Sequence, residues 1–197
     1  MSLADASGLL GVSVERVRQL VVAGDLPGTR FGNAWAVPRE ALVARQHSPG
    51  SGGRPLSAAR AWRDIVAGEV DLGRPGRYQR RARLVRCEMS AANVASLPRL
   101  AGALVGGVRA AVAHGSALGV ADGSDLYLSQ AAFEVLGSRV AYVADPLGAV
   151  RLRVVDDEAW ALVPPGDLAP RAAVALDLLD SADPRHWIAA EQLLRDG

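Results

Sequence analysis

A short stretch near the N-terminus carries polar side chains of the types that read base pairs in duplex DNA: Ser13, Glu15, Arg16, Arg18 and Gln19. A guanidinium can donate two hydrogen bonds to guanine, and a carboxamide can pair with adenine, so Arg16 and Gln19 suit base edges. The hydroxyl of Ser13 is better suited to a phosphate oxygen. These residues could contact DNA only if one helix presents them together.

Apolar periodicity places this stretch on the second of two short helices. The first is expected over residues 3–10 and ends at Gly11, because glycine permits the backbone of a tight turn. Ser13 is a favourable N-cap for the second, over residues 14–23. Its inward side would be formed by Val17, Leu20 and Val21. Two short helices joined in this way are typical of a helix-turn-helix, whose second helix enters the major groove.

A hairpin is expected after the second helix. Residues 29–37 alternate around Gly32-Asn33, a dipeptide that favours a tight turn, and a short helix should follow from Arg39 to Arg45. Arg30, Asn33 and Arg39 are the side chains of this part that we expect to contact DNA.

The order of these residues resembles the winged helix-turn-helix domain of the excisionase/MerR type. The resemblance is carried by Ala6, Leu10-Gly11-Val12-Ser13, Val17, Leu20, Gly24, Leu26-Pro27, Gly32, Trp35, Pro38 and Leu42. It implies a DNA-binding domain over residues 1–46. A basic residue commonly follows the wing tryptophan in such domains, whereas Ala36 stands there in this chain. Arg30 or Arg39 would therefore have to supply the phosphate contact of the wing.

Residues 47–54 are expected to form a flexible linker, because they are rich in Gly and Ser.

Residues 55–95 are expected to form an arginine-rich helical connector. Nine arginines fall between positions 54 and 86, against Asp64, Glu69 and Asp71. A helix over residues 78–88 would expose the side chains that we regard as candidates for phosphate contact: Arg77, Arg80, Arg81 and Arg83. A solvated helix face without a partner is the alternative interpretation of the same charges.

Residues 96–197 show short strands alternating with helices, which predicts a C-terminal α/β domain and an α+β fold for the whole chain. Strands are expected over residues 125–128, 139–143 and 149–155. Helices are expected over residues 98–105, 130–136, 170–179 and 184–194, the first and the last two opened by proline.

One possible catalytic motif is incomplete. His114-Gly115-Ser116 followed by Asp125 is similar to a nucleotidyltransferase, which pairs a Gly-Ser turn with two carboxylates that hold magnesium. The second carboxylate position is occupied by Tyr127, so the metal would be held poorly. Cys87 is the single cysteine, and the three histidines are scattered. We therefore expect no enzymatic activity, no metal and no cofactor, and keep a degenerate nucleotidyltransferase-like enzyme as the less favoured alternative.

The C-terminal part resembles AbiEi-like antitoxins of nucleotidyltransferase toxin systems. The matching stretches are HGSALGV, VRLRVVDDEAW and LAPRAAVALDLLDSADPRHWIAAEQLL. The resemblance implies a transcriptional repressor of its own operon that also neutralises a toxin protein. Another alternative is a regulator that senses a small molecule through its C-terminal domain. Clustered aromatic residues would favour a ligand pocket, but only 5% of the residues are aromatic.

The expected partners are double-stranded DNA, a cognate toxin and a second copy of the chain. A homodimer is expected because one small domain buries little surface on DNA, and operators are commonly read by symmetric dimers. The apolar runs are too short to span a membrane, and no secretion signal is recognisable, so a cytoplasmic location is expected.

Overall fold

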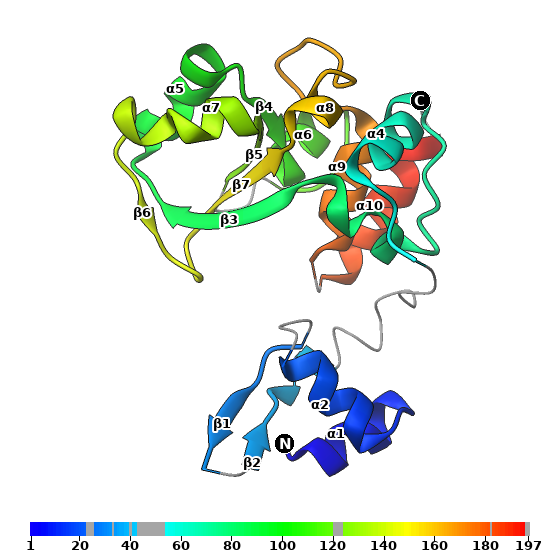
Figure 1. Cartoon of the computed structure of the whole chain (residues 1–197). Coiled ribbons are helices and arrows are strands. Elements are labelled where there is room, and N and C mark those ends of the chain that lie inside the picture. The colour runs from blue at the N-terminus through cyan, green and yellow to red at the C-terminus, as the bar shows by residue number, and fades with distance from the viewer. Residues whose placement is uncertain are drawn as a thin grey trace. The chain divides into compact units, whose positions relative to one another are not determined.

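The chain folds into two compact units, Met1–Gly50 and Ser51–Gly197 (Figure 1). The computed structural model describes residues 1–22, 26–32, 34–39, 41–42, 54–119, 124–181 and 183–195. Residues 47–53 of the expected linker lie outside the described residues. Helices and a mixed sheet make the fold α+β, as expected from the sequence.

The N-terminal unit begins with two helices and continues with a hairpin. α1 spans Leu3–Leu10 and starts with a capping box between Ser2 and Asp5, which satisfies backbone N–H groups of the first turn. Gly11 ends α1 in the left-handed region at φ 64°. α2 spans Val14–Val22. β1 (Thr29–Phe31) pairs antiparallel with β2 (Ala34–Ala36). These elements agree with the sequence prediction, and of the helix expected over residues 39–45 only 39, 41 and 42 are described.

A small apolar core holds this unit together. Its buried members come from both helices and from the segments that flank the hairpin: Ala6, Val17, Leu20, Val21, Leu26, Val37 and Leu42. The backbones of Met1 and Val37 exchange two hydrogen bonds of 2.9 Å, which fasten the start of the chain to the end of the hairpin. The inward side of α2 is therefore fixed, and its opposite side faces away from this core.

The C-terminal unit is built on a five-stranded sheet in the order β4-β5-β7-β3-β6. The strands are β3 (Arg83–Glu88), β4 (Leu104–Gly106), β5 (Ser124–Ser129), β6 (Val143–Ala144) and β7 (Val150–Val155). β5 and β7 run parallel, and the other neighbouring strands pair antiparallel. Tyr127 lies beside Arg153 in the register of β5 and β7, so these two side chains share one face of the sheet.

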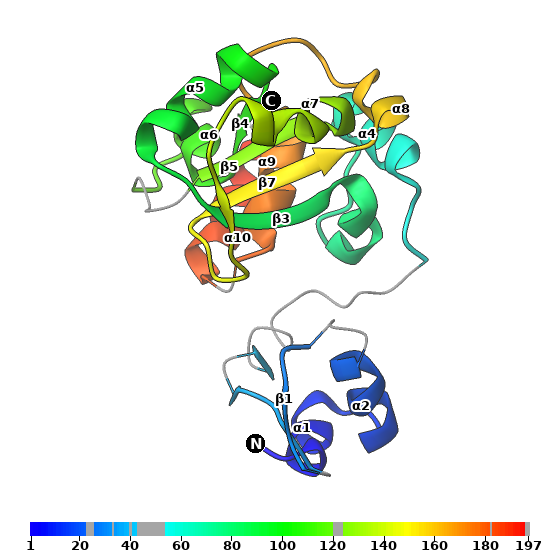
Figure 2. The same cartoon turned by 60° about the vertical axis from the view of Figure 1, so that its left-hand side comes forward.

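Helices cover both faces of this sheet (Figure 2). The face that carries Tyr127 packs against α4 (Ala58–Ala67), α6 (Gly107–Ala113), α8 (Asp157–Trp160), α9 (Arg171–Leu179) and α10 (Pro184–Arg195). The face that carries Leu126 packs against α5 (Ala91–Ala101) and the short segments α7 (Gln130–Glu134) and η2 (Leu136–Ser138). No helix within the described ranges combines the length and the hydropathy that crossing a bilayer requires.

Three predicted elements of this unit are wrong. Residues 78–88 do not form one helix, because the 3-10 segment η1 (Pro75–Arg81) leads directly into strand β3. Pro98 does not open a helix but lies inside α5, which starts at the Ser90 cap and is held in place by the buried Val94 and Leu97. The strand expected over residues 139–143 is reduced to Val143–Ala144. α4, η1 and β3, assigned to a connector from the sequence, contribute to the C-terminal unit.

Candidate nucleic-acid interface

α2 presents a polar side because its apolar side is buried. Val17 is fully buried, and Leu20 and Val21 are exposed by 4% and 6%. The Ser13 hydroxyl accepts the backbone N–H of Arg16 at 3.2 Å, which confirms Ser13 as the N-cap. A hydroxyl that accepts this bond still has its own proton to donate, so the cap does not prevent Ser13 from contacting a phosphate.

The side chains proposed to read DNA lie on the exposed side of α2 and pair with one another. Arg18 makes two hydrogen bonds of 3.0 Å with the carboxylate of Glu15. The Nη1 atom of Arg16 lies 3.4 Å from Oε1 of Gln19. The hydrogen bond from Arg18 lowers the pKa of Glu15 and raises the pKa of Arg18, so both remain charged. The structure thus brings Glu15, Arg16, Arg18 and Gln19 together on one exposed surface.

The candidates on and after the hairpin are exposed where they are described. Arg30 is exposed and its Nε atom donates to the carbonyl of Gly32 at 2.9 Å, which holds the side chain against its own turn. Arg39 is exposed at the start of the short segment after the hairpin. Asn33 lies outside the described residues.

The arginine-rich block does not form the single basic helix face that the sequence suggested. Arg80 and Arg83 are exposed, and Arg77 is half-buried. Arg83 lies over the ring of Phe133, with 4.9 Å between the guanidinium carbon and the ring centroid. Arg81 is exposed by only 4%, so its assignment to phosphate contact is wrong. The 3-10 turn before β3 directs this side chain into the interior instead of outward.

Arg81 belongs to an ion cluster whose buried members are Arg81, Asp125, Arg153 and Asp177. Arg151 and Asp180 lie at the edge of this cluster, with side chains exposed by 27% and 43%. Oδ1 of Asp177 lies 3.0 Å from Nη2 of Arg81 and 3.0 Å from Nε of Arg153. The same oxygen accepts the hydroxyl of Tyr127 at 2.5 Å, and Oδ2 accepts the backbone N–H of Gly107 at 3.1 Å. The Asp177 side chain is fully buried, so these contacts replace all of its hydration.

Two further carboxylates complete the cluster. Oδ2 of Asp180 lies 2.7 Å from Arg81 and 2.8 Å from Arg153. Asp125 contacts Arg151 at 2.6 Å and Arg153 at 3.2 Å. Three arginines therefore face three aspartates, and the charges within the cluster balance.

The pKa directions in the cluster follow from burial and from these contacts. Burial raises the pKa of Asp125, assisted by the charge of Asp177 and opposed by Arg153 and Arg151. Burial opposes the ionisation of Asp180, but the charges and hydrogen bonds of Arg81 and Arg153 outweigh it and lower the pKa of Asp180. Desolvation also opposes the charge on Arg81, whose pKa is nevertheless raised by Asp180, Tyr127 and Asp177. Arg81 thus stays protonated and paired, and it is not available to an external phosphate.

The structure removes the support for magnesium chemistry at Asp125. Both carboxylate oxygens of Asp125 contact arginines, so a cation would have to displace Arg151 and Arg153. The Nε2 atom of His114 forms a hydrogen bond of 2.9 Å with the carbonyl oxygen of Ala169. Across the ranges that the structure describes, no group of three or more His, Cys, Asp and Glu residues could hold a metal ion.

The ion cluster is not among the features predicted from the sequence, although the sequence carries one signal for it. Asp177 interrupts the apolar run Ala172–Leu178, all of which is buried. A buried carboxylate is costly unless a cation or hydrogen-bond donors pair with it. Candidates for the cation are Arg151 and Arg153, in the strand predicted over residues 149–155.

Comparisons with protein-family models, with curated proteins and with solved structures found no match for this chain. The assignment of a function therefore depends on the residues and their geometry.

Proposed function

We propose that this protein is a sequence-specific DNA-binding transcriptional regulator whose α2 reads the major groove as part of a winged helix-turn-helix of the excisionase/MerR type. The observation that carries the proposal is the exposed group Glu15, Arg16, Arg18 and Gln19 on a helix whose other side is locked in a core. A rigid helix with an exposed polar side near its N-terminus is what recognition of base edges requires.

The contacts seen within α2 can be exchanged for contacts with DNA at small cost. The side chains of Arg18 and Glu15 are both more than half exposed, so water screens this ion pair and its loss costs little. The Arg16–Gln19 hydrogen bond is long, at 3.4 Å. Arg16 would pair with guanine and Gln19 with adenine.

Phosphate contacts would position this helix on the duplex. Arg30 and Arg39 can supply them from the N-terminal unit, together with Ser13 and Asn33. In the C-terminal unit, Arg77, Arg80 and Arg83 remain candidates, because at least part of each side chain is accessible. A homodimer would double these contacts and match a symmetric operator.

We further propose that the regulator is an antitoxin that represses its own operon and neutralises a nucleotidyltransferase-type toxin. Its support is the resemblance of the C-terminal stretches to AbiEi-like antitoxins. The burial of Asp125 between two arginines favours this regulatory role over catalysis by the chain itself. The neighbouring gene tests the proposal: a nucleotidyltransferase gene beside this one supports it, and an operon without a toxin gene contradicts it.

Substitution of Arg16 tests the DNA-binding proposal. Arg16→Ala should weaken binding to the DNA upstream of the gene by about 1–3 kcal/mol, because a bidentate base contact is lost. Fluorescence anisotropy with a labelled duplex measures this change. Affinity for the intact protein should also fall steeply as salt increases, since phosphate contacts release counterions.

Arg63→Ala is the matched control, because Arg63 is an exposed arginine on α4 in the other unit. Its affinity and salt dependence should equal those of the unchanged protein. Binding that responds neither to salt nor to Arg16→Ala would refute the proposed role of α2.

A further inference from the structure

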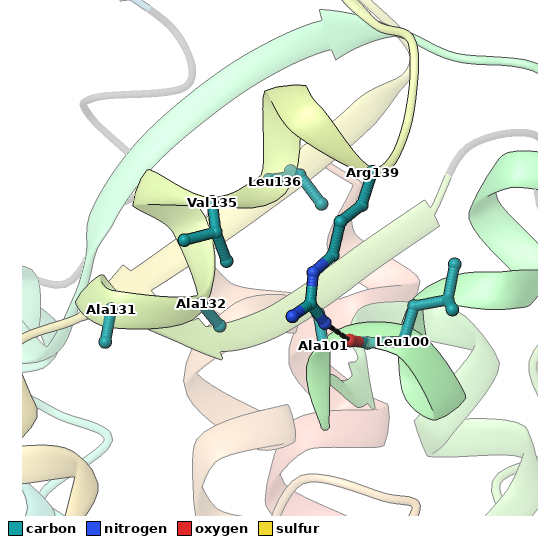
Figure 3. A pocket seen from close by; sticks show the side chains of 7 residues that line it. All are labelled: Leu100, Ala101, Ala131, Ala132, Val135, Leu136 and Arg139. Atoms are coloured by element: carbon teal, nitrogen blue, oxygen red, sulfur yellow. Dashed lines mark hydrogen bonds between the residues drawn. The ribbon is translucent and has the colours of Figure 1, made fainter.

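A pocket of about 310 Å³ lies between the end of α5 and the α7–η2 segment (Figure 3). Its lining comes from two separate parts of the chain: Leu100 and Ala101, and Ala131, Ala132, Val135, Leu136 and Arg139. The volume is near the lower end of the range for small-molecule sites, about 300–1,000 Å³.

The walls of this pocket are aliphatic. Figure 3 shows Val135 and Leu136 on one side and Leu100 and Ala101 on the other. Leu100 and Val135 are exposed by 36% and 45%, although both are large apolar residues. Apolar side chains left open around a hollow favour an apolar occupant, because its entry would remove their surface from water.

Of the described residues that line the pocket, Arg139 is the one that carries a charge. Its side chain reaches across the pocket, and Nη1 donates to the carbonyl of Leu100 at 2.8 Å (Figure 3). This bond uses one of the five guanidinium donors. Among the described residues, no carboxylate lies within ion-pair distance of Arg139, in contrast to Arg81 and Arg153. The pocket therefore combines an apolar wall with a cation whose charge is not balanced by a neighbouring carboxylate.

We propose that this pocket binds a small organic acid that has a short aliphatic chain and one carboxylate. The chain would lie against Val135 and Leu136, and the carboxylate would accept hydrogen bonds from Arg139. One guanidinium among aliphatic side chains suits a monoanion better than a phosphate, which needs more donors. The site lies within the C-terminal unit and is independent of DNA binding by α2.

The test compares three ligands that share one chain and differ in charge. Octanoate, octanol and octylammonium are titrated into the full-length protein by isothermal calorimetry, and amide NMR shifts locate the binding. Octanoate should bind about tenfold or more tightly than octanol, because it adds charge-assisted hydrogen bonds. Octylammonium should bind least. The shifts should be confined to residues 100–101 and 131–139.

Three variants link this binding to the pocket. Arg139→Gln should remove the preference for octanoate over octanol. Ala132→Phe should fill the hollow and abolish binding of both, and Val135→Glu should abolish octanoate binding by placing a carboxylate beside Arg139. Val135 is already exposed, so Val135→Glu should keep the fold intact. It therefore tests the site even if Ala132→Phe does not fold. Ala95→Phe on the exposed side of α5 is the control and should bind octanoate unchanged.

The proposal is overturned if octanoate shows no saturable binding, or binds no more tightly than octylammonium. Binding that persists unchanged in Val135→Glu would overturn it as well. Because the readout is ligand binding to the C-terminal unit, none of these outcomes depends on whether the protein binds DNA.

Discussion

Asp177→Ala should lower the free energy of unfolding of the C-terminal unit by about 3–5 kcal/mol, the cost of leaving buried charges without their partner. The Asp177 carboxylate is fully buried and contacts both Arg81 and Arg153. It also accepts the hydroxyl of Tyr127 and the backbone N–H of Gly107. Removal of one side chain thus leaves two guanidinium groups undercompensated and two neutral donors unpaired.

Urea denaturation followed by tryptophan fluorescence measures this loss. Trp62 is a suitable reporter, because its ring packs edge-on against Tyr127 and its indole N–H donates to the carbonyl of Arg81 at 2.9 Å. Glu191→Ala is the matched control, since Glu191 pairs with Arg195 on the exposed surface of α10, and such pairs contribute about 0–1 kcal/mol. If both variants lose the same small amount, the cluster does not stabilise the unit.

Gly107→Ala should destabilise the same unit by about 2–5 kcal/mol. Gly107 has φ +56°, and an alanine in this left-handed region costs about 1–2 kcal/mol. An added Cβ would also lie 2.8 Å from the carboxyl carbon of Asp125 and closer still to Oδ2. Asp125 would have to move away from Arg151 and Arg153, and such overpacking adds about 1–3 kcal/mol.

Gly102→Ala separates these two contributions. Gly102 has nearly the same backbone conformation, φ +59°, but nothing lies within 4 Å of an added Cβ. This variant should show only the backbone cost, so the difference between the two midpoints in urea reports the clash with Asp125. Equal losses for the two variants would mean that Asp125 shifts freely and that the cluster is not tightly packed.

Local patterns predicted the two helices and the hairpin that the structure describes in the N-terminal unit. Ser2 and Ser13 as caps, Gly11 as the turn and the buried side of α2 all follow from residues within a few positions of one another. The exposed side of α2 follows from the same periodicity, since it lies opposite Val17, Leu20 and Val21. Local rules were sufficient here because the caps and the turn join near neighbours, and because the apolar periodicity of α2 marks its buried side whatever packs against it.

Local rules failed where distant residues decide the outcome. The arginines before and within β3 suggested an exposed helix face that contacts phosphate, yet Arg81 is buried against Asp177, which lies 96 positions away in the sequence. Arg151 and Arg153 alternate with apolar residues, a pattern typical of a strand with one side in water. That side is instead covered by α9, which supplies Asp177, one of the carboxylates that pair with Arg153. Pro98 is accommodated in α5 because tertiary packing of Val94 and Leu97 outweighs the local preference.

Arg81 is separated from Asp177 and Asp180 by 96 and 99 positions in the sequence, so the two parts of the ion cluster are synthesised at different times. Arg81 leaves the ribosome long before Asp177 and Asp180, and until α9 emerges its guanidinium must remain hydrated. High contact order of this kind slows folding, because the chain must close a long loop before the interaction is gained. The C-terminal unit can therefore complete its interior only after α9 has been translated, and a nascent chain truncated before Asp177 would retain uncompensated arginines.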